Sequence, residues 1–292
     1  MRIVMTGATS GIGREAAREL RRRGADLVAG VRSSGADLPE GARRAALNLA
    51  DLDSVRAFAA EVGREPIDVL IGNAGMQVMS PRRSRQGYEL TFATNHLAHY
   101  LLVRLLLPSM APGGRVILTS SGTHDPEQKT GMPPPRHADA ALLAYPDRDP
   151  ETDAKPGTAG RRAYSSSKLC NLMTIRELAR RTTDRPDLAA IAFDPAFVPG
   201  TGLARDYGAV LDWVFRRVFP LVIRGKHVST PGISGRALAD LATEPGYAGR
   251  RGEYWSVRSR RATPATPSAL ARDDAACARL WDASADMVGL AA

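Results

Sequence analysis

Short apolar segments alternate with longer helix-compatible segments from residue 1 to residue 120, and this alternation constrains the fold more than any other feature. The strand-like segments are 2–6, 26–31, 69–71 and 116–119, and the helix-like segments are 14–23, 52–62 and 88–110. Strands that alternate with helices in this way form a parallel sheet whose crossover helices cover both faces. The sequence therefore predicts an α/β, doubly wound parallel sheet with three αβα layers.

The second half of the chain continues the pattern after an interruption. Residues 122–160 contain Pro133-Pro134-Pro135 and little apolar periodicity, which predicts a long insertion. Further segments are expected as helices at 163–181, 229–243 and 273–288, and as strands at 188–193 and 254–257. No internal repeat or linker separates two cores, so we expect one domain over residues 1–292.

The glycine-rich run from Thr6 to Gly13 follows the first predicted strand and opens the first predicted helix. Glycines at that place let the backbone approach a phosphate at the helix N-terminus. The run therefore predicts the dinucleotide-binding turn of a Rossmann fold. The predicted cofactor-binding residues in it are Gly7, Thr9, Ser10, Gly11, Ile12 and Gly13.

The formal net charge of +9 at first suggests a nucleic-acid partner. However, only four of the 40 basic residues are lysines, and the arginines are spread along the chain without a long block. Dispersed charge is typical of a solvated surface, so we expect no nucleic-acid partner.

The apolar runs are too short for a membrane span of roughly 18 residues, because Arg104 interrupts the longest candidate. The apolar start ends at Gly7, too early for a signal-peptide core, and we expect a cytoplasmic protein without stable membrane insertion. Cys170, Cys277 and the five histidines lack metal-ligand spacing, so no metal is expected. A packing or hydrogen-bonding role is expected for His96 and His99.

Four further motifs occur in order along the chain. Asn73-Ala74-Gly75 and Ser120-Ser121 stand at the ends of predicted strands, Asn95 lies in the predicted helix over 88–110, and Tyr164-Ser165-Ser166-Ser167-Lys168 opens the next predicted helix. With the glycine run, whose first two glycines have three residues between them, they show that the chain resembles the short-chain dehydrogenase/reductase family over nearly its whole length. The resemblance implies that Asn95, Ser121, Tyr164 and Lys168 are the catalytic residues. It also implies cofactor contacts from Asn73, Ala74, Gly75, Tyr164, Lys168, Pro195, Val198 and Thr201.

The residue types fit hydride transfer to a carbonyl, in which the substrate oxygen develops negative charge. A phenol with a pKa of about 10 donates a proton slowly at neutral pH, so its pKa has to be lowered. Tyr164 and Lys168 are four residues apart on one predicted helix face, where the ammonium can stabilise the phenolate. The family resemblance implies that Ser121 binds the substrate oxygen and that Asn95 holds a water in a proton relay.

The end of the second predicted strand indicates which dinucleotide is preferred. NAD-dependent proteins usually have an acidic residue there, whereas this chain has Arg32 and Ser33, which suit the 2′-phosphate of NADP. Asn48-Leu49 stands where the family often has Asp-Leu beside the adenine. We therefore expect NADP(H) rather than NAD(H).

Within the family, the chain resembles two related groups, the light-dependent protochlorophyllide reductases and the retinol-dehydrogenase-like enzymes. The resemblance rests on residues 95–102, 163–174, 201–203, 252–256 and 280–290. The pigment enzymes carry a cysteine after a Pro-Gly pair, where this chain has Pro195-Ala196-Phe197. Phenylalanine supplies no thiol or proton, and alanine in place of glycine predicts a changed backbone at 196.

The resemblance and the bulky segment at 201–228 favour an NADP(H)-dependent ketoreductase or alcohol dehydrogenase for a bulky hydrophobic substrate, such as a polycyclic ketone, a quinone or a retinoid-like molecule. Thr123, Phe197 and Trp213 are the candidate substrate contacts, although the aromatic residues near Trp213 fit core packing equally well. Both the insertion and the segment 201–228 are expected to border the substrate pocket. The alternatives are light-dependent reduction of protochlorophyllide at a carbon–carbon double bond and a catalytically silent dinucleotide-binding regulator. The expected assembly is a monomer or a homodimer.

Overall fold

The computed structural model describes residues 1–33, 35–198 and 229–291. The strands in this part of the chain form one sheet in the order β3-β2-β1-β4-β5-β6-β7-β8, parallel throughout except for the antiparallel pair β7 and β8. Their bounds are β1 Arg2–Thr6, β2 Asp26–Val31, β3 Arg43–Ala46, β4 Ile67–Gly72, β5 Met110–Thr119, β6 Ala189–Asp194, β7 Arg251–Arg258 and β8 Arg261–Pro264. The doubly wound α/β fold is confirmed.

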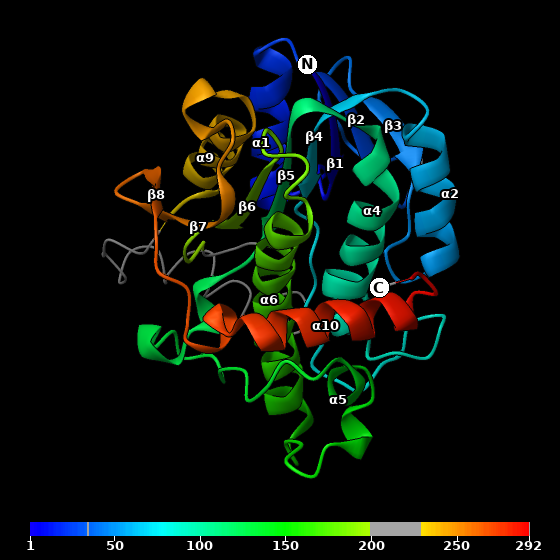
Figure 1. Cartoon of the computed structure of the whole chain (residues 1–292), viewed down its shortest axis with the longest axis vertical. Coiled ribbons are helices and arrows are strands. Elements are labelled where there is room, and N and C mark those ends of the chain that lie inside the picture. Colours follow the sequence, from blue (N-terminus) through cyan, green and yellow to red (C-terminus); the bar gives the residue numbers. More distant parts are fainter. Residues whose placement is uncertain (34, 199–228, 292) are drawn as a thin grey trace.

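Helices cover both faces of the sheet and give the three layers seen in Figure 1. Their bounds are α1 Gly11–Arg22, α2 Leu52–Val62, α3 Leu90–Phe92, α4 Ala98–Leu106, α5 Ala140–Ala144, α6 Pro156–Arg181, α9 Pro231–Thr243 and α10 Asp274–Met287. One apolar core joins the sheet to α2, α4 and α6, with α10 packed outside them, and a second core joins it to α1 and α9. None of the described helices is long and apolar enough to cross a membrane.

The strand order places the expected site at the point where the chain reverses direction across the sheet. β1 pairs with β2 on one side and with β4 on the other, so the crossover connections leave β1 and β4 toward opposite edges. Ligands of open α/β sheets bind at the carboxyl ends of the strands beside such a point. Thr6 ends β1, Gly72 ends β4 and Thr119 ends β5.

The predicted helix over 52–62 is confirmed with the same bounds. The Asp51 side chain accepts the N–H of Asp53 and so caps the N-terminus of this helix. The predicted helix over 88–110 is confirmed as one run of helical backbone from Leu90 to Leu106, although it contains a π-helical segment and ends earlier than expected. A π-helical segment at Ala93–Leu97 separates α3 from α4, and β5 already begins at Met110. Two short edge strands, β3 and β8, were not predicted because each has only one buried residue, Ala45 and Ala262, and lacks an apolar run.

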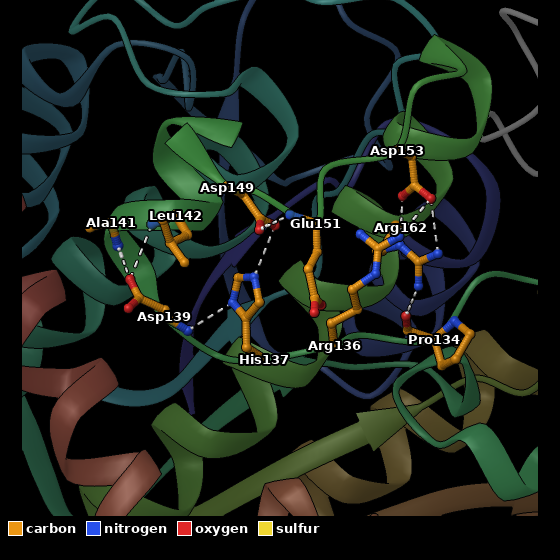
Figure 2. Close-up of polar contacts among 10 residues, drawn as sticks. All are labelled: Pro134, Arg136, His137, Asp139, Ala141, Leu142, Asp149, Glu151, Asp153 and Arg162. Atoms are coloured by element: carbon orange, nitrogen blue, oxygen red, sulfur yellow. Dashed lines mark hydrogen bonds and ion pairs between the residues drawn. The ribbon is translucent and has the colours of Figure 1, made fainter. Parts of the chain in front are cut away.

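The predicted insertion is shorter than expected, because α6 begins at Pro156. Side chains cap and join its turns (Figure 2): Asp139 accepts the N–H groups of Ala141 and Leu142, and Arg162 of α6 pairs with Asp153 at 2.6 Å. The Arg162 guanidinium holds the pKa of Asp153 below its usual range. The insertion is thereby fastened to the first half of the helix that carries Tyr164.

Candidate active site

The glycine turn between β1 and α1 has the shape that a phosphate requires. Gly7 and Gly11 have φ of 71° and 52°, in the left-handed region that glycine tolerates. A Cβ at Gly13 would lie 1.9 Å from the Gly7 carbonyl oxygen. The N-cap residue Ser10 makes no side-chain cap, and the first turn of α1 carries no acidic residue. This cradle fits the pyrophosphate of a dinucleotide, which would use the free N–H groups.

The Thr6 hydroxyl joins the glycine turn to the loop after β4. Its oxygen accepts the backbone N–H groups of Asn73 at 3.1 Å and Ala74 at 3.0 Å. Asn73 in turn donates from Nδ2 to the Gly7 carbonyl oxygen at 3.2 Å. The Asn73-Ala74-Gly75 motif is therefore built into the wall of the predicted nucleotide site.

The two serines after β5 have different surroundings. Ser120 donates from Oγ to the Lys168 carbonyl oxygen at 2.9 Å, so it ties the strand end to α6. Ser121 accepts the N–H of Thr123 at 3.3 Å and is half-buried. Its hydroxyl also hydrogen-bonds the Tyr164 phenol, which lowers the pKa of that group against the effect of burial. Ser121 is thus the serine that lies with Tyr164.

Tyr164 and Lys168 lie on α6, both buried, with the Lys168 ammonium 5.6 Å from the centre of the Tyr164 ring. Lys168 donates from Nζ to the Thr119 carbonyl oxygen at 3.1 Å, and Asn171 donates to the same oxygen at 3.1 Å. A Cβ on Gly75 would lie 3.2 Å from that ammonium, so a side chain there would displace the end of Lys168 by a few tenths of an ångström.

The expected lowering of the Tyr164 pKa is not found in the protein alone. Burial is the largest influence and raises the pKa of Tyr164, the charge of Asp194 raises it further, and only the bond to Ser121 lowers it. Burial lowers the pKa of Lys168 to about 8, while Asp194 opposes that change. At neutral pH the phenol is therefore protonated and most of the ammonium is charged.

Asn95 lies in the π-helical segment, and its side chain hydrogen-bonds the backbone of the loop that follows β4. Its Oδ1 accepts the N–H of Met76 at 2.8 Å, and its Nδ2 donates to the Met76 carbonyl oxygen at 2.8 Å and to Ser167 Oγ at 3.0 Å. Ser167 donates to the Tyr164 carbonyl oxygen at 2.7 Å. Asn95 is thereby fixed beside the helix of Tyr164 and Lys168, and the bulge matches the frequent use of π-turns at functional sites.

Asp194 is a buried carboxylate beside the site that sequence reasoning missed. It ends β6 and accepts hydrogen bonds from Tyr254 at 3.1 Å, from Ser256 at 2.8 Å and from the N–H of Ala196 at 2.9 Å. A Cβ on Gly122 would lie 3.6 Å from its Oδ2, which places the charge next to the turn of Ser121. The acidic residue before Pro195 was the only signal in the sequence.

The backbone after Asp194 corrects one expectation. Ala196 has φ of 62°, so alanine at this position has not moved the backbone out of the region that glycine favours. Phe197 is 44% exposed and Val198 is buried. Pro195 is also buried, and its carbonyl oxygen accepts from Ser234 at 2.7 Å. Thr201 and Trp213 lie outside the described residues.

The residues expected at the adenosine end lie on the surface. Arg32 and Ser33 are exposed just after β2, and Arg32 has no hydrogen bond or ion pair within the described ranges. Asn48 is exposed and accepts the N–H of Ala50 at 3.2 Å, while Leu49 is half-buried. The Arg32 guanidinium is therefore available to bind a phosphate, whereas the Asn48 side chain is already hydrogen-bonded within its own turn.

Two hollows lie outside this site. A cavity of about 310 Å³ lies between the insertion and α6, and neither Tyr164 nor Lys168 lines it. The residues of α6 that do are Pro156, Ala159, Gly160, Arg162, Ala163 and Ser166. A groove of about 1060 Å³ between α1 and α9 is lined mostly by charged residues. Among residues 1–33, 35–198 and 229–291, no group of three His, Cys, Asp or Glu side chains is arranged to hold a metal.

Known proteins with the same combination of fold and motifs are numerous. The sequence model of the family described as short chain dehydrogenase matches residues 1–131. Protochlorophyllide reductase A from Oryza sativa is 30% identical, over 99% of this chain and 80% of that protein. Protochlorophyllide reductase from Pisum sativum is 31% identical, over 99% and 78%.

Solved structures agree with these relatives. An uncharacterized protein from Mycobacterium paratuberculosis superposes with a TM-score of 0.72 at 28% identity, covering 99% of this chain and 94% of that one. A blue fluorescent protein from a metagenomic library, solved in complex with NADPH, superposes with a TM-score of 0.63 at 22% identity, over 88% and 96%. The latter likeness shows the fold alone.

The fold and the site define a Rossmann-type oxidoreductase that uses a nicotinamide dinucleotide. The chain belongs to the short-chain dehydrogenase/reductase family, within the branch that contains the protochlorophyllide reductases.

Proposed function

We propose that this protein is an NADP(H)-dependent ketoreductase or alcohol dehydrogenase that acts on a bulky hydrophobic substrate. The observation that carries the proposal is the meeting of Ser121, Tyr164 and Lys168 where the end of β5 lies beside the first half of α6. The glycine turn beside them supports a dinucleotide, and the unpaired Arg32 supports the 2′-phosphate. The resemblance of the whole chain to enzymes of a large cyclic pigment supports the substrate class.

The reduced nicotinamide, when bound, supplies the hydride. In reduction, Tyr164 donates its phenolic proton to the substrate oxygen, and Ser121 hydrogen-bonds the same oxygen. The raised pKa of Tyr164 keeps that proton in place until the oxygen becomes basic. Lys168, held by the Thr119 carbonyl, places positive charge near the phenolate left behind.

Light-dependent reduction of a carbon–carbon double bond is the second candidate. It is favoured by the curated relatives, which are protochlorophyllide reductases and match 99% of the chain. Against it, the chain has Phe197 where those enzymes are expected to carry a cysteine. The same Tyr164 would serve as proton donor to carbon in that reaction.

A substrate screen distinguishes the two. Purified protein is mixed with NADPH and a panel of ketones, quinones, polycyclic carbonyl compounds and protochlorophyllide, and NADPH absorbance is followed in the dark and under illumination. We expect dark oxidation of NADPH with at least one compound and its loss in Tyr164→Phe. Turnover only with protochlorophyllide under illumination would support the second candidate, and an unchanged rate in Tyr164→Phe would contradict the mechanism.

A further inference from the structure

His99 is a buried titratable group beside the site, and the mechanism above gives it no role. It lies on α4, fully buried, between the ends of the parallel strands and α6. Its Nε2 is 2.9 Å from Thr6 Oγ1, and its Nδ1 is 2.9 Å from the backbone oxygen of Asn95. One imidazole therefore joins the residue that precedes the glycine turn to the residue expected to hold the relay.

The partners of the ring define its protonation state. A carbonyl oxygen only accepts, so the proton between His99 and Asn95 belongs to Nδ1. Thr6 Oγ1 already accepts two backbone N–H groups, so its own hydrogen is directed to Nε2. His99 is thus a neutral imidazole with its hydrogen on Nδ1. Burial lowers its pKa to about 4, and the nearby Lys168 charge acts in the same direction.

Gly72, at the end of β4, leaves space for the imidazole ring of His99. A Cβ on Gly72 would lie 2.8 Å from His99 Cδ2 and 2.5 Å from Leu118 Cδ2. Both neighbours are buried, so a larger residue at Gly72 would displace the imidazole or the leucine. The space at the end of β4 therefore matches the side chain that fills it.

We propose that His99 is a positioning residue that couples the dinucleotide-binding turn to the relay residue Asn95. The inference rests on the proposed oxidoreductase function. Toward the nucleotide, His99 orients Thr6, which holds Asn73 and Ala74 against Gly7. Toward the reacting groups, it fixes the Asn95 carbonyl, whose side chain is bonded through Ser167 to the backbone of Tyr164.

Two substitutions separate the two halves of this role. His99→Gln places an amide near the Nε2 position, so it can keep the link to Thr6 and lose the link to Asn95. His99→Asn places an amide near the Nδ1 position and keeps the opposite link. We expect His99→Asn to raise the KM for NADPH roughly tenfold with a smaller change in kcat, and His99→Gln to lower kcat roughly tenfold with a smaller change in KM.

His96 supplies the matched control. It is equally buried, three residues earlier, but its Nε2 is 2.9 Å from Ser284 Oγ on α10, away from the nucleotide turn. His96→Gln should lower the melting temperature and leave the KM for NADPH and kcat unchanged. Should the His99 variants fold poorly, Thr6→Val tests the same link, and Thr6→Ser, which keeps the hydroxyl, should lose less NADPH affinity.

The tautomer and NADPH affinity are measured without any substrate. Nitrogen-15 NMR of histidine-labelled protein should show His99 as the neutral Nδ1–H form at neutral pH, and an Nε2–H form or an imidazolium would overturn the network. NADPH titration by calorimetry should show weaker binding in His99→Asn than in His99→Gln. Equal losses of stability with unchanged KM, kcat and NADPH affinity would reduce His99 to packing. Intact NADPH binding without any turnover would instead contradict the proposed reaction alone.

Discussion

At the scale of single residues, charge and backbone conformation decide most of what the site can do. Asp194 is a buried negative charge beside Tyr164 and Lys168; it adds to the burial that raises the pKa of Tyr164 and opposes the burial that lowers the pKa of Lys168. Its Oδ1 also holds the N–H of Ala196, the residue with a left-handed backbone. A short turn that a glycine would adopt without strain is thus maintained by a carboxylate and a local hydrogen bond.

Ala196→Gly should therefore stabilise the protein. Relief of the left-handed alanine is worth about 1–2 kcal/mol, and the greater freedom of glycine in the unfolded chain offsets part of it, so we expect a net gain of up to about 1 kcal/mol. The free energy of unfolding from urea titration measures this gain. Ala248→Gly is the control, because Ala248 has φ of −64° and should lose about 0.5–1 kcal/mol. A loss in both variants would contradict the strain at Ala196.

Arg32→Ala tests the preference for NADP. Loss of one charged hydrogen bond to a phosphate costs about 1.5–3 kcal/mol, so the KM for NADPH should rise roughly tenfold to a hundredfold while the KM for NADH stays the same. Arg18→Ala is the control, because Arg18 is exposed on α1 and pairs with Glu15. An equal rise for both dinucleotides would show that Arg32 does not contact the 2′ position.

At the scale of elements, tertiary contacts override what a local pattern predicts. Apolar spacing and an Asp cap define α2, and both lie within one short segment. The segment 88–110 forms the expected long helix, but Asn95 bonds to Met76, and the helix has a π-helical segment there. Local periodicity carries no information about a partner 19 residues away, so this π-helical segment was not predictable from it.

The N-terminal half of α6 provides a test of close packing between elements. A Cβ on Gly160 would lie 1.9 Å from the Val78 carbonyl oxygen, whereas a Cβ on Gly157 would meet only the flexible end of Met79 at 3.3 Å. Gly160→Ala should destabilise the protein by about 1–3 kcal/mol, and Gly157→Ala should be neutral or stabilising by up to about 1 kcal/mol. Thermal or urea unfolding of the two variants measures the difference, and similar values would contradict the contact.

At the scale of the whole molecule, three buried histidines make stability depend on pH. Burial lowers the pKa of His96 to about 3 and of His99 to about 4, and it also lowers the pKa of His124. In the unfolded chain these groups titrate near pH 6.5. The unfolded state then binds more protons than the folded state below that pH, so the free energy of unfolding falls as the pH falls.

Between pH 7 and about pH 5, we expect His96 and His99 together to remove about 4 kcal/mol of stability. Most carboxylates have not yet titrated in this window, since their unperturbed pKa values are near 4. Urea titrations at the two pH values measure the loss, and His96→Gln should reduce it by about half. Equal stability at both pH values would contradict the buried neutral histidines.

The sequence by itself determined the alternation of strands and helices and the glycine turn after the first strand, because each of these depends on neighbours within a few residues. Only the tertiary structure decided that Asp194 is buried with Tyr254 and Ser256, that His99 joins Thr6 to Asn95, and that burial raises the Tyr164 pKa. Burial and electrostatics depend on groups that the fold brings together from distant strands. Such contacts leave no periodic signal in the chain.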